Sequence, residues 1–260
     1  KPGGLSLGSL YAWAEADDPA GGNGHRAGAT IKDTAPSSPA ELLTPYTLGE
    51  VVATFKKWLY MPDPSPLYIN LAAVVANRMP GDPVWLLTVG VPGGGKTEIL
   101  QSLTRLPNTY QAATLTEGAL LSGTSKREAA AGAKGGLLRE IGDFGILLVK
   151  DFGSFLTLNK DTRGAILQAL REIYDGAWTR HVGTDGGRAL HWQGKIGLVG
   201  GATGAIDAHH SVMAILGERF VFYRLPELEE TKHASGALGH IGQEQEMRAE
   251  LARAVQNLFI

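Results

Sequence analysis

The sequence contains no cysteine. This absence excludes disulfide bonds, cysteine–zinc sites and thiol catalysis, and it agrees with a cytoplasmic protein. No apolar run approaches the roughly 18 residues that a membrane-spanning helix needs, so we expect no membrane partner. The chain also lacks an excess of positive charge, because 24 Lys and Arg residues face 26 Asp and Glu residues. A globally basic nucleic-acid binder is therefore excluded, and any contact with nucleic acid must come from a local patch.

What the chain does contain is apolar material and glycine. Hydrophobic residues make up 43% of the 260 residues, enough for a sizeable core in one or two domains. Glycine accounts for 35 residues, almost twice the usual share of roughly 7%. Much of the backbone must therefore turn tightly or lie close to another group.

The composition changes along the chain. We expect residues 1–46 to be a flexible linker, in which residues 5–16 could form one short amphipathic helix. The sequence Thr47-Leu48-Gly49-Glu50 has the form of a capping box and predicts the start of an ordered helix. The chain starts at Lys1 without an initiator methionine and ends inside a helical pattern at Ile260. We therefore expect a fragment of a longer protein.

From residue 84 the pattern predicts an α/β fold. Apolar runs predict strands at 84–89, 110–115, 145–149 and 195–202, and helical periodicity predicts helices at 67–79, 96–104 and 161–174. Alternation of strands and helices indicates a three-layer, mostly parallel sheet with helices on both faces. Residues 178–182 and 188–193 flank a turn signal and predict a β-hairpin insertion.

The strongest motif is the glycine-rich loop at residues 90–97, which fits G-x-x-x-x-G-K-[ST]. Glycines let successive backbone N–H groups turn inward around an anion, and the following helix directs its positive N-terminus at phosphate. Lys96 can reach the β- and γ-phosphates, and the Thr97 hydroxyl can bind Mg²⁺. We therefore predict ATP and Mg²⁺ as cofactors, with the nucleotide held by Gly90, Pro92, Gly93, Gly94, Gly95, Lys96, Thr97 and Glu98.

A carboxylate must complete the magnesium site. The buried strand that ends at Val149 is followed by Lys150 and Asp151. In one register Asp151 is the Mg²⁺ acid and lacks an adjacent base; in the other it occupies the position that orients the attacking water. A third reading makes Asp151 a helix cap. Either catalytic register predicts slow hydrolysis, because only one acid is present.

These motifs resemble those of the AAA+ ATPases over roughly residues 47–230. The resemblance implies a nucleotide-binding core at 47–226 with a partial helical lid at 227–260. It also implies that Thr203 senses the γ-phosphate after the strand that ends at Ala202. Arg219, followed by Phe220, would be the arginine finger that acts on a neighbouring subunit, and Arg224 is the second choice. ATP would then lie between subunits of a homo-oligomer, as in a hexameric ring.

The predicted hairpin is similar to the pre-sensor-1 hairpin of bacterial enhancer-binding transcription activators. Minichromosome maintenance and superfamily 3 helicases carry a hairpin at the same place. Residues 117–136 correspond in position to the activators' pore loop, but the Gly-Ala-Phe-Thr-Gly-Ala signature is absent. This absence counts against transcription activation.

In such helicases the hairpins hold nucleic acid in a central pore. Basic groups could follow phosphates, and an aromatic ring could stack on a base. The alternative is a solvated hairpin whose Trp178 and Trp192 belong to the core. The candidate DNA-binding residues are Arg180, His181, Arg188, His191 and Lys195, with Lys126 and Arg127 in the neighbouring loop.

Residues 7–14 resemble a short helical signature near the end of primase modules in phage and plasmid replication proteins. The first hypothesis is therefore an ATP-driven DNA helicase or translocase from a mobile-element replication protein, acting on single-stranded or forked DNA. The second is a protein-remodelling or switch ATPase of the activator, loader or defence type. A third is a scaffold that binds nucleotide without turnover.

Overall fold

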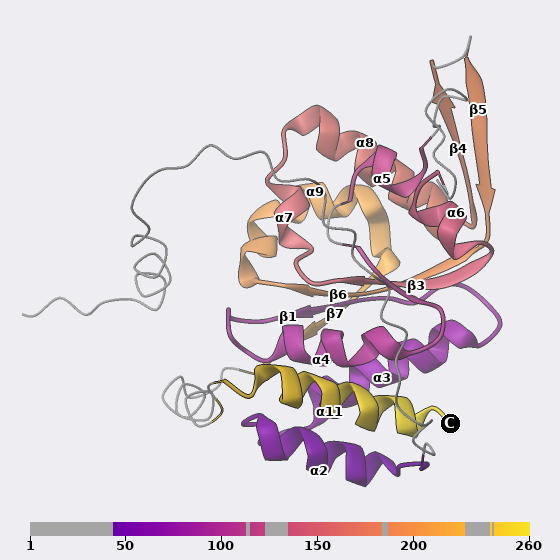
Figure 1. Ribbon diagram of the computed structural model, residues 1–260. Coiled ribbons are helices and arrows are strands. Elements are labelled where there is room, and N and C mark those ends of the chain that lie inside the picture. The colour runs from indigo at the N-terminus through magenta and orange to yellow at the C-terminus, as the bar shows by residue number, and fades with distance from the viewer. Residues whose placement is uncertain (1–43, 113–114, 123–134, 184–186, 227–239, 241) are drawn as a thin grey trace, which may run out of the picture. The chain divides into compact units, whose positions relative to one another are not determined.

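A sheet of five parallel strands forms the centre of the protein. The structure is a computed structural model and describes residues 44–260 apart from 113–114, 123–134, 184–186, 227–239 and 241. The predicted helix at 5–16 and almost all of the predicted linker lie outside these residues. The strand order is β2-β3-β6-β1-β7 (Figure 1). The bounds are β1 Trp85–Val89, β2 Thr109–Gln111, β3 Phe144–Val149, β6 Lys195–Ala202 and β7 Phe220–Arg224.

β1 lies between β6 and β7 and is buried along its whole length. Its side chains alternate between the two faces of the sheet, so both faces must be apolar. Trp85, Leu87 and Val89 join one hydrophobic cluster, whereas Leu86 joins the other. The apolar run in the sequence is the direct consequence of this double burial.

Short helices and α8 cover one face of the sheet. α8 begins after Asn159, whose side chain accepts a hydrogen bond from the Thr162 N–H at 2.9 Å. The other elements on this side of the sheet are short (Figure 1). The bounds are α5 Glu117–Leu120, α6 Leu137–Ile141, α7 Gly153–Leu156, α8 Lys160–Tyr174, η3 Gly204–His209, α9 His210–Met213 and η4 Ala214–Arg219.

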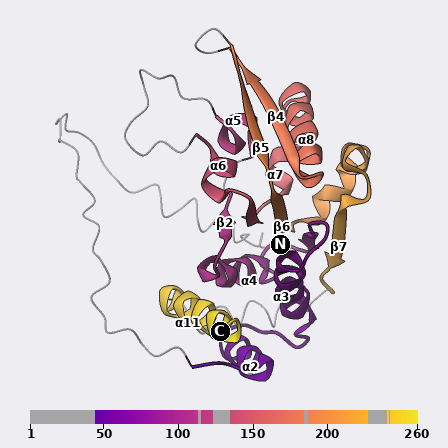
Figure 2. The ribbon, with the colours of Figure 1, turned by 90° about the vertical axis from the view of Figure 1, so that its right-hand side faces the viewer.

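The opposite face carries α3 Ser65–Arg78 and α4 Lys96–Ser102, with α2 Leu48–Trp58 and α11 Glu244–Leu258 beyond them (Figures 1 and 2). The capping box at the start of α2 is formed as expected. The Thr47 N–H donates to Glu50 Oε2 at 2.7 Å, and the Glu50 N–H donates to Thr47 Oγ1 at 3.3 Å.

The predicted α/β fold is confirmed, and the differences are at element ends. The helix predicted at 96–104 ends at Ser102 and continues as a 3₁₀ turn, η1 Leu103–Arg105. In place of the strand predicted at 110–115, the described residues show β2 at Thr109–Gln111, at the edge of the sheet beside β3. Among the described residues, no helix combines the length and the apolar composition required to cross a membrane.

α11, which belongs to the predicted lid region, packs into the core. Met247, Leu251 and Val255 share a hydrophobic cluster with residues of α2, α3 and α4. A polar clamp adds to this packing, because Glu250 accepts hydrogen bonds from Lys57 Nζ and from Trp58 Nε1, both at 2.7 Å. The clamp joins the last turn of α2 to the middle of α11.

The β-hairpin consists of β4 Ala177–Val182 and β5 Arg188–Gln193, paired antiparallel. Its strands begin near the edge of the central sheet and extend away from it beside α8 (Figure 1). The hairpin was predicted with nearly these bounds.

Removal of the Glu250 carboxylate should destabilise the protein. Glu250→Ala should lower the free energy of unfolding at pH 7 by about 1–2 kcal/mol, because it leaves Lys57 and Trp58 without this acceptor. Burial raises the pKa of Glu250, but the hydrogen bonds from Lys57 and Trp58 and the positive charges of Lys57 and Arg253 together outweigh it and hold the pKa below its ordinary value. The ionised form is therefore the stabilising one, and the difference from wild type should shrink as pH falls below about 4.3.

Urea unfolding at pH 7, 5 and 4 measures this effect. Glu246→Ala, an exposed position of the same helix, is the matched control and should change stability little. Equal losses in the two variants, or a difference that grows on acidification, would contradict the clamp.

Candidate nucleotide-binding site

The glycine-rich loop joins the carboxyl end of β1 to the first residue of α4. Gly93 and Gly95 have φ angles of 78° and 77°. Residues other than glycine rarely adopt this left-handed backbone conformation. The Gly95 N–H donates to the Gly93 carbonyl at 2.9 Å, and Gly95 is the N-cap of α4. The strand–loop–helix context that the motif requires is present.

The start of this loop is held by the strands on either side of β1. The Gly90 N–H donates to the Ala202 carbonyl at the end of β6, at 3.1 Å. On the other side the Leu225 N–H, just after β7, donates to the Val89 carbonyl at 2.8 Å. A Cβ atom on Gly90 would lie only 2.8–3.0 Å from three atoms of the Leu225 side chain. Glycine is therefore needed at position 90 for close packing.

Lys96 is folded into its own loop. Only 9% of the residue is exposed. Its Nζ donates to the Gly90 carbonyl at 2.9 Å and to the Val91 carbonyl at 2.6 Å. Burial lowers the pKa of Lys96, and the negative charge of Asp151 opposes that shift. A phosphate that enters the loop would replace the two carbonyls as the partner of the ammonium group.

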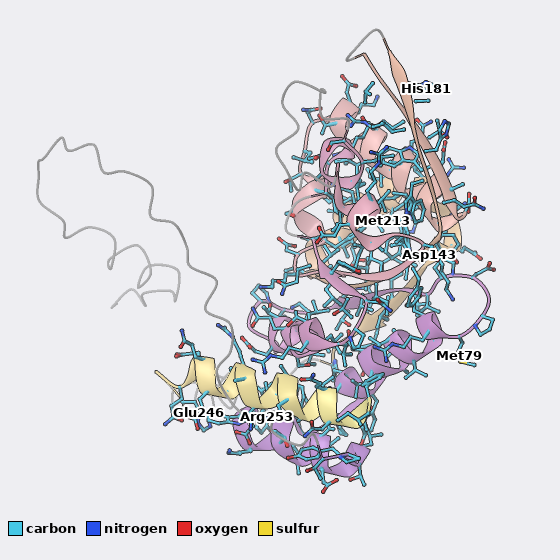
Figure 3. All side chains as sticks on the ribbon, turned by 45° about the vertical axis from the view of Figure 1, so that its right-hand side comes forward. Met79, Asp143, His181, Met213, Glu246 and Arg253 are labelled. Carbon is cyan, nitrogen blue, oxygen red and sulfur yellow. The ribbon has the colours of Figure 1, made fainter. Side chains whose placement is uncertain are left out.

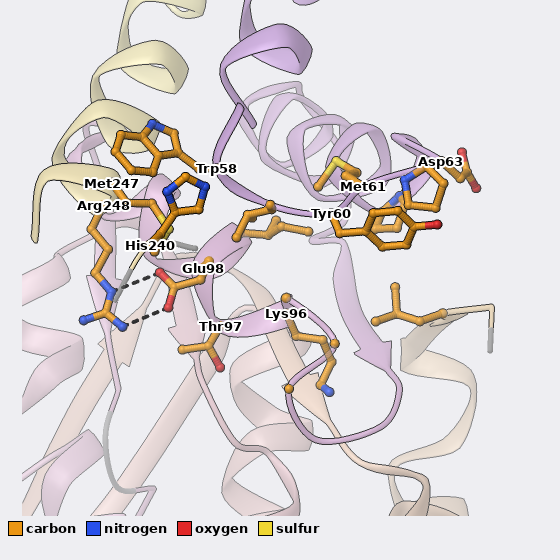
Figure 4. Close-up of a pocket in the computed structure, with 18 of the residues that line it drawn as sticks. Trp58, Tyr60, Met61, Asp63, Lys96, Thr97, Glu98, His240, Met247 and Arg248 are labelled. Atoms are coloured by element: carbon orange, nitrogen blue, oxygen red, sulfur yellow. Dashed lines mark hydrogen bonds and ion pairs between the residues drawn. The ribbon is translucent and has the colours of Figure 1, made fainter. Parts of the chain in front are cut away.

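A cavity of about 440 Å³ opens beside this loop (Figure 4). Residues 93–98 of the predicted nucleotide-binding set line its polar end, whereas Gly90 and Pro92 are not in its lining. Mostly apolar side chains form another part of the wall, where the rings of Trp58 and His240 meet at an angle of 59° with their centroids 4.9 Å apart. A nucleotide has a charged phosphate part and a largely apolar base, so a cavity with one polar and one apolar end suits it.

Sequence reasoning missed the apolar wall. It comes from the end of α2 and the residues after it, from His240 and from α11, which are far apart in the sequence and meet only in the fold. The residues concerned are Trp58, Tyr60, Met61, His240 and Met247. No motif in the sequence marked these residues as part of a binding site.

Glu98, predicted as a nucleotide ligand, has another partner. Its carboxylate accepts hydrogen bonds from Arg248 Nε at 3.0 Å and from Arg248 Nη2 at 2.9 Å. Arg248 comes from α11, and no motif pointed to it. The ion pair ties α11 to the helix that follows the phosphate loop, and both side chains line the cavity (Figure 4).

Asp151 is exposed at the end of β3. Its Oδ1 accepts a hydrogen bond from the Gly153 N–H at 3.0 Å, which supports the turn into α7. The negative charge of the same carboxylate opposes the lowering of the Lys96 pKa by burial, so this charge acts at the phosphate loop. Thr97 and Asp151 supply the hard oxygen atoms that Mg²⁺ prefers, and Mg²⁺ commonly takes one or two protein oxygens together with phosphates. These residues fit a magnesium site that is completed by the nucleotide.

Thr203 directly follows β6 and is adjacent to Ala202, whose carbonyl holds Gly90. Arg224 ends β7, the strand on the other side of β1. Its guanidinium binds Asp207 of η3 through hydrogen bonds of 3.0 and 2.7 Å, and 57% of the side chain is exposed. The segments that follow β6 and β7 are therefore joined next to the phosphate loop.

Arg219 is directed into its own chain. Its Nη2 donates to both carboxylate oxygens of Asp175, at 2.9 and 3.0 Å, and its guanidinium lies 5.2 Å from the centre of the Tyr174 ring. Only 21% of the side chain is exposed. An arginine finger must reach a neighbouring subunit, so Arg219 would first have to leave these partners. The role assigned to it from the sequence stays a prediction.

The two tryptophans of the hairpin belong to the core. Trp178 and Trp192 are buried and face each other across the two strands. Trp192 Nε1 also donates to the Gly142 carbonyl at 2.7 Å. The structural alternative for these rings is therefore the correct one, and neither is placed to stack on a base.

Among the described residues, the predicted basic side chains do not lie on one surface. Arg180 faces inward and donates to the Leu121 carbonyl at 2.6 Å, and Lys195 donates to the Met79 carbonyl at 2.7 Å near the base of the hairpin. His181 and His191 are exposed on the outer face, with His191 Nδ1 2.9 Å from the Thr179 hydroxyl. Figure 3 shows how far Met79 and His181 are separated along the molecule. Lys126, Arg127 and the side chain of Arg188 lie outside the described residues.

The sequence matches no protein-family model and no curated protein. Among solved structures, the apo C-terminal region of NrS-1 is 14% identical, covers 85% of this chain and 48% of its own, and has a TM-score of 0.40. NtrX from Brucella abortus in complex with ADP is 14% identical over 78% of this chain and 44% of its own, with a TM-score of 0.43. JCV helicase with a bound thiazolopyridine compound is 18% identical over 82% and 54%, with a TM-score of 0.39.

The chain thus spans about half the length of these solved chains. At these identities and TM-scores, the likenesses assign neither a family nor an activity to it.

Crowding at position 90 should be measurable. Gly90→Ala should weaken nucleotide binding roughly tenfold or more, because the added Cβ displaces the loop from Leu225. Leu225→Ala removes two of the three clashing atoms, so the double variant should bind more tightly than Gly90→Ala alone. Titration calorimetry with ATP measures both, and Gly164→Ala, where a Cβ meets no atom within 4 Å, is the control. Unchanged affinity in Gly90→Ala would refute the packing argument.

Arg180 should behave as an anchor of the segment that ends at Leu121. Arg180→Met should lower the free energy of unfolding by about 1 kcal/mol, since a half-buried carbonyl loses its donor. Arg171→Met on the exposed side of α8 should have little effect. Denaturant unfolding and titration with labelled single-stranded DNA test this together. Normal stability with weaker DNA binding would instead make Arg180 a phosphate contact.

Proposed function

We propose that this chain binds and hydrolyses ATP as the motor module of a ring-forming DNA helicase or translocase, in a replication protein of a mobile element. The observation that best supports this proposal is the buried Lys96 at the N-terminus of α4, next to a cavity of about 440 Å³ with a largely apolar wall. The Lys96 ammonium is held by two carbonyls inside the glycine loop, where an anion that enters the loop can replace them.

In this proposal the apolar wall beside Trp58 and His240 takes the base, and the loop takes the phosphates. Lys96 would bind phosphate oxygens, and the N–H groups at the start of α4 would add positive potential. Thr97 and Asp151 would hold Mg²⁺, which neutralises phosphate charge when bound. Thr203, at the end of β6, would sense the terminal phosphate. Asp151 has no acidic neighbour in sequence, so hydrolysis by the isolated chain should be slow.

We also propose that the working form is a homo-oligomer, as in a hexameric ring, in which an arginine from one subunit completes the site of the next. Arg224 is the more accessible candidate, because its pair with Asp207 is largely exposed. Arg219 is the second candidate, since it is stacked on Tyr174 and paired with Asp175. This order reverses the preference drawn from the sequence.

The hairpin and the segment between α5 and α6 would be the moving parts that hold DNA. Arg180 of β4 donates to the Leu121 carbonyl, so it joins the hairpin to the residue that follows α5. Lys126, Arg127 and Arg188 remain the proposed phosphate contacts of this pair of loops.

A specific observation favours a second candidate, an ATPase that remodels a protein partner. The outward positions of the hairpin carry no lysine or arginine. They are Ala177, Thr179, His181, Ala189, His191 and Gln193. A surface of this kind suits contact with a protein better than contact with a phosphate backbone, which needs positive charge.

Steady-state ATP hydrolysis, with and without single-stranded DNA, tests the proposal. The wild type and Lys96→Ala would be compared at several protein concentrations. We expect the hydrolysis rate per protein molecule to rise with protein concentration, because the site is completed between subunits. DNA should stimulate this hydrolysis, and Lys96→Ala should abolish it. Asp151→Asn should abolish turnover but retain ATP binding.

Hydrolysis that ignores DNA would favour the protein-remodelling candidate. Binding of ATP without turnover at any concentration would indicate a nucleotide-binding scaffold. Full activity in Lys96→Ala would refute the assignment of the cavity as the ATP site.

A further inference from the structure

Glu98 places a negative charge at a site that is built for anions. It lies in the first turn of α4, directly after Thr97, and lines the same cavity as Lys96. Only 17% of its side chain is exposed. A carboxylate in this position is favoured by the helix dipole, but it occupies the electrostatic environment that a phosphate would use.

Arg248 is the cation that neutralises this carboxylate. Both of its bonds to Glu98 involve one edge of the guanidinium, formed by Nε and Nη2. The ion pair raises the pKa of Arg248 through the hydrogen bond and the charge of Glu98. In Figure 4 this edge is turned towards Glu98 and the start of α4, where Thr97 and Lys96 lie. The edge that faces the site is therefore already taken.

Arg248 also has the freedom to change partner. Its side chain is 46% exposed, so the guanidinium can be reached by another anion. A guanidinium binds a carboxylate and a phosphate with the same fork of N–H groups. The same edge cannot make both bidentate contacts at once, so the two anions compete for it.

We infer that Glu98 is a positioning residue that retains Arg248 in the nucleotide-free state, and that a bound phosphate must take Arg248 from Glu98. This inference rests on the proposed nucleotide function and assigns regulation to that same site. Glu98 thus lowers the resting affinity for nucleotide. In this inference Glu98 competes with the nucleotide for Arg248. The sequence had instead predicted that Glu98 binds the nucleotide.

The test is a double-mutant cycle with Glu98→Gln, Arg248→Gln and the double variant, read out as ATP affinity by titration calorimetry in the presence of Mg²⁺. We expect Glu98→Gln to bind ATP about fivefold more tightly than wild type, because Arg248 is released. In the Arg248→Gln background the same substitution should give a clearly smaller gain, which isolates competition from the loss of a negative charge. Glu246→Gln, the same change on α11 outside the cavity, should leave ATP affinity unchanged.

The melting temperature of the nucleotide-free protein supplies the second readout. Glu98→Gln should leave it unchanged or lower it, since an ion pair is lost, while ATP affinity rises. A purely structural role for Glu98 predicts that both decrease. A gain of equal size in both backgrounds, or weaker ATP binding by Glu98→Gln, would overturn the inference.

Failure of the proposed function looks different. If the wild type does not bind ATP, or if Lys96→Ala binds it normally, the cavity is not the nucleotide site and both proposals fall. If Lys96→Ala abolishes binding and the cycle shows no coupling, only the role of Glu98 is refuted.

Discussion

The position of β1 between two parallel neighbours is the constraint on which the site depends. Parallel strands end at the same edge of a sheet, so the segments after β6 and β7 emerge beside the loop that follows β1. Two hydrogen bonds fasten this arrangement, from Gly90 to the Ala202 carbonyl and from Leu225 to the Val89 carbonyl. The loop is thus held from both sides, and Thr203 and Arg224 are brought next to it as a consequence.

Three cations around this loop have internal partners among the described residues of the nucleotide-free chain. Lys96 binds the carbonyls of its own loop, Arg248 binds Glu98, and Arg224 binds Asp207. None of these groups is left in an apolar environment without compensation, which would be costly. The site is therefore stable when empty, and a ligand gains affinity only by offering better partners than those already present. Control by exchange of partners is a natural property of such a site.

The side chains of the hairpin strands alternate between two faces with different surroundings. Its strands alternate between an inner face with Trp178, Arg180 and Trp192 and an outer face with His181 and His191. Charge in a sequence says nothing about which face carries it. Arg180 and Lys195 were predicted to meet DNA, but each satisfies a backbone carbonyl of a neighbouring segment. Cations near a hairpin can bind nucleic acid only where the pleat turns them outward.

The sequence by itself determined the α/β class, the hairpin, the capping box at Thr47 and the phosphate loop, because each depends on local chemistry within a few residues. Apolar runs report burial on both faces, and glycines before Lys96 report a left-handed loop at the start of a helix. Only the tertiary structure decided the apolar wall of the cavity, the pair of Glu98 with Arg248 and the inward course of Arg219. The pair of Glu98 and Arg248 joins residues that are 150 positions apart in the sequence. Their partners are chosen by the packing of helices on the sheet, which no local pattern encodes.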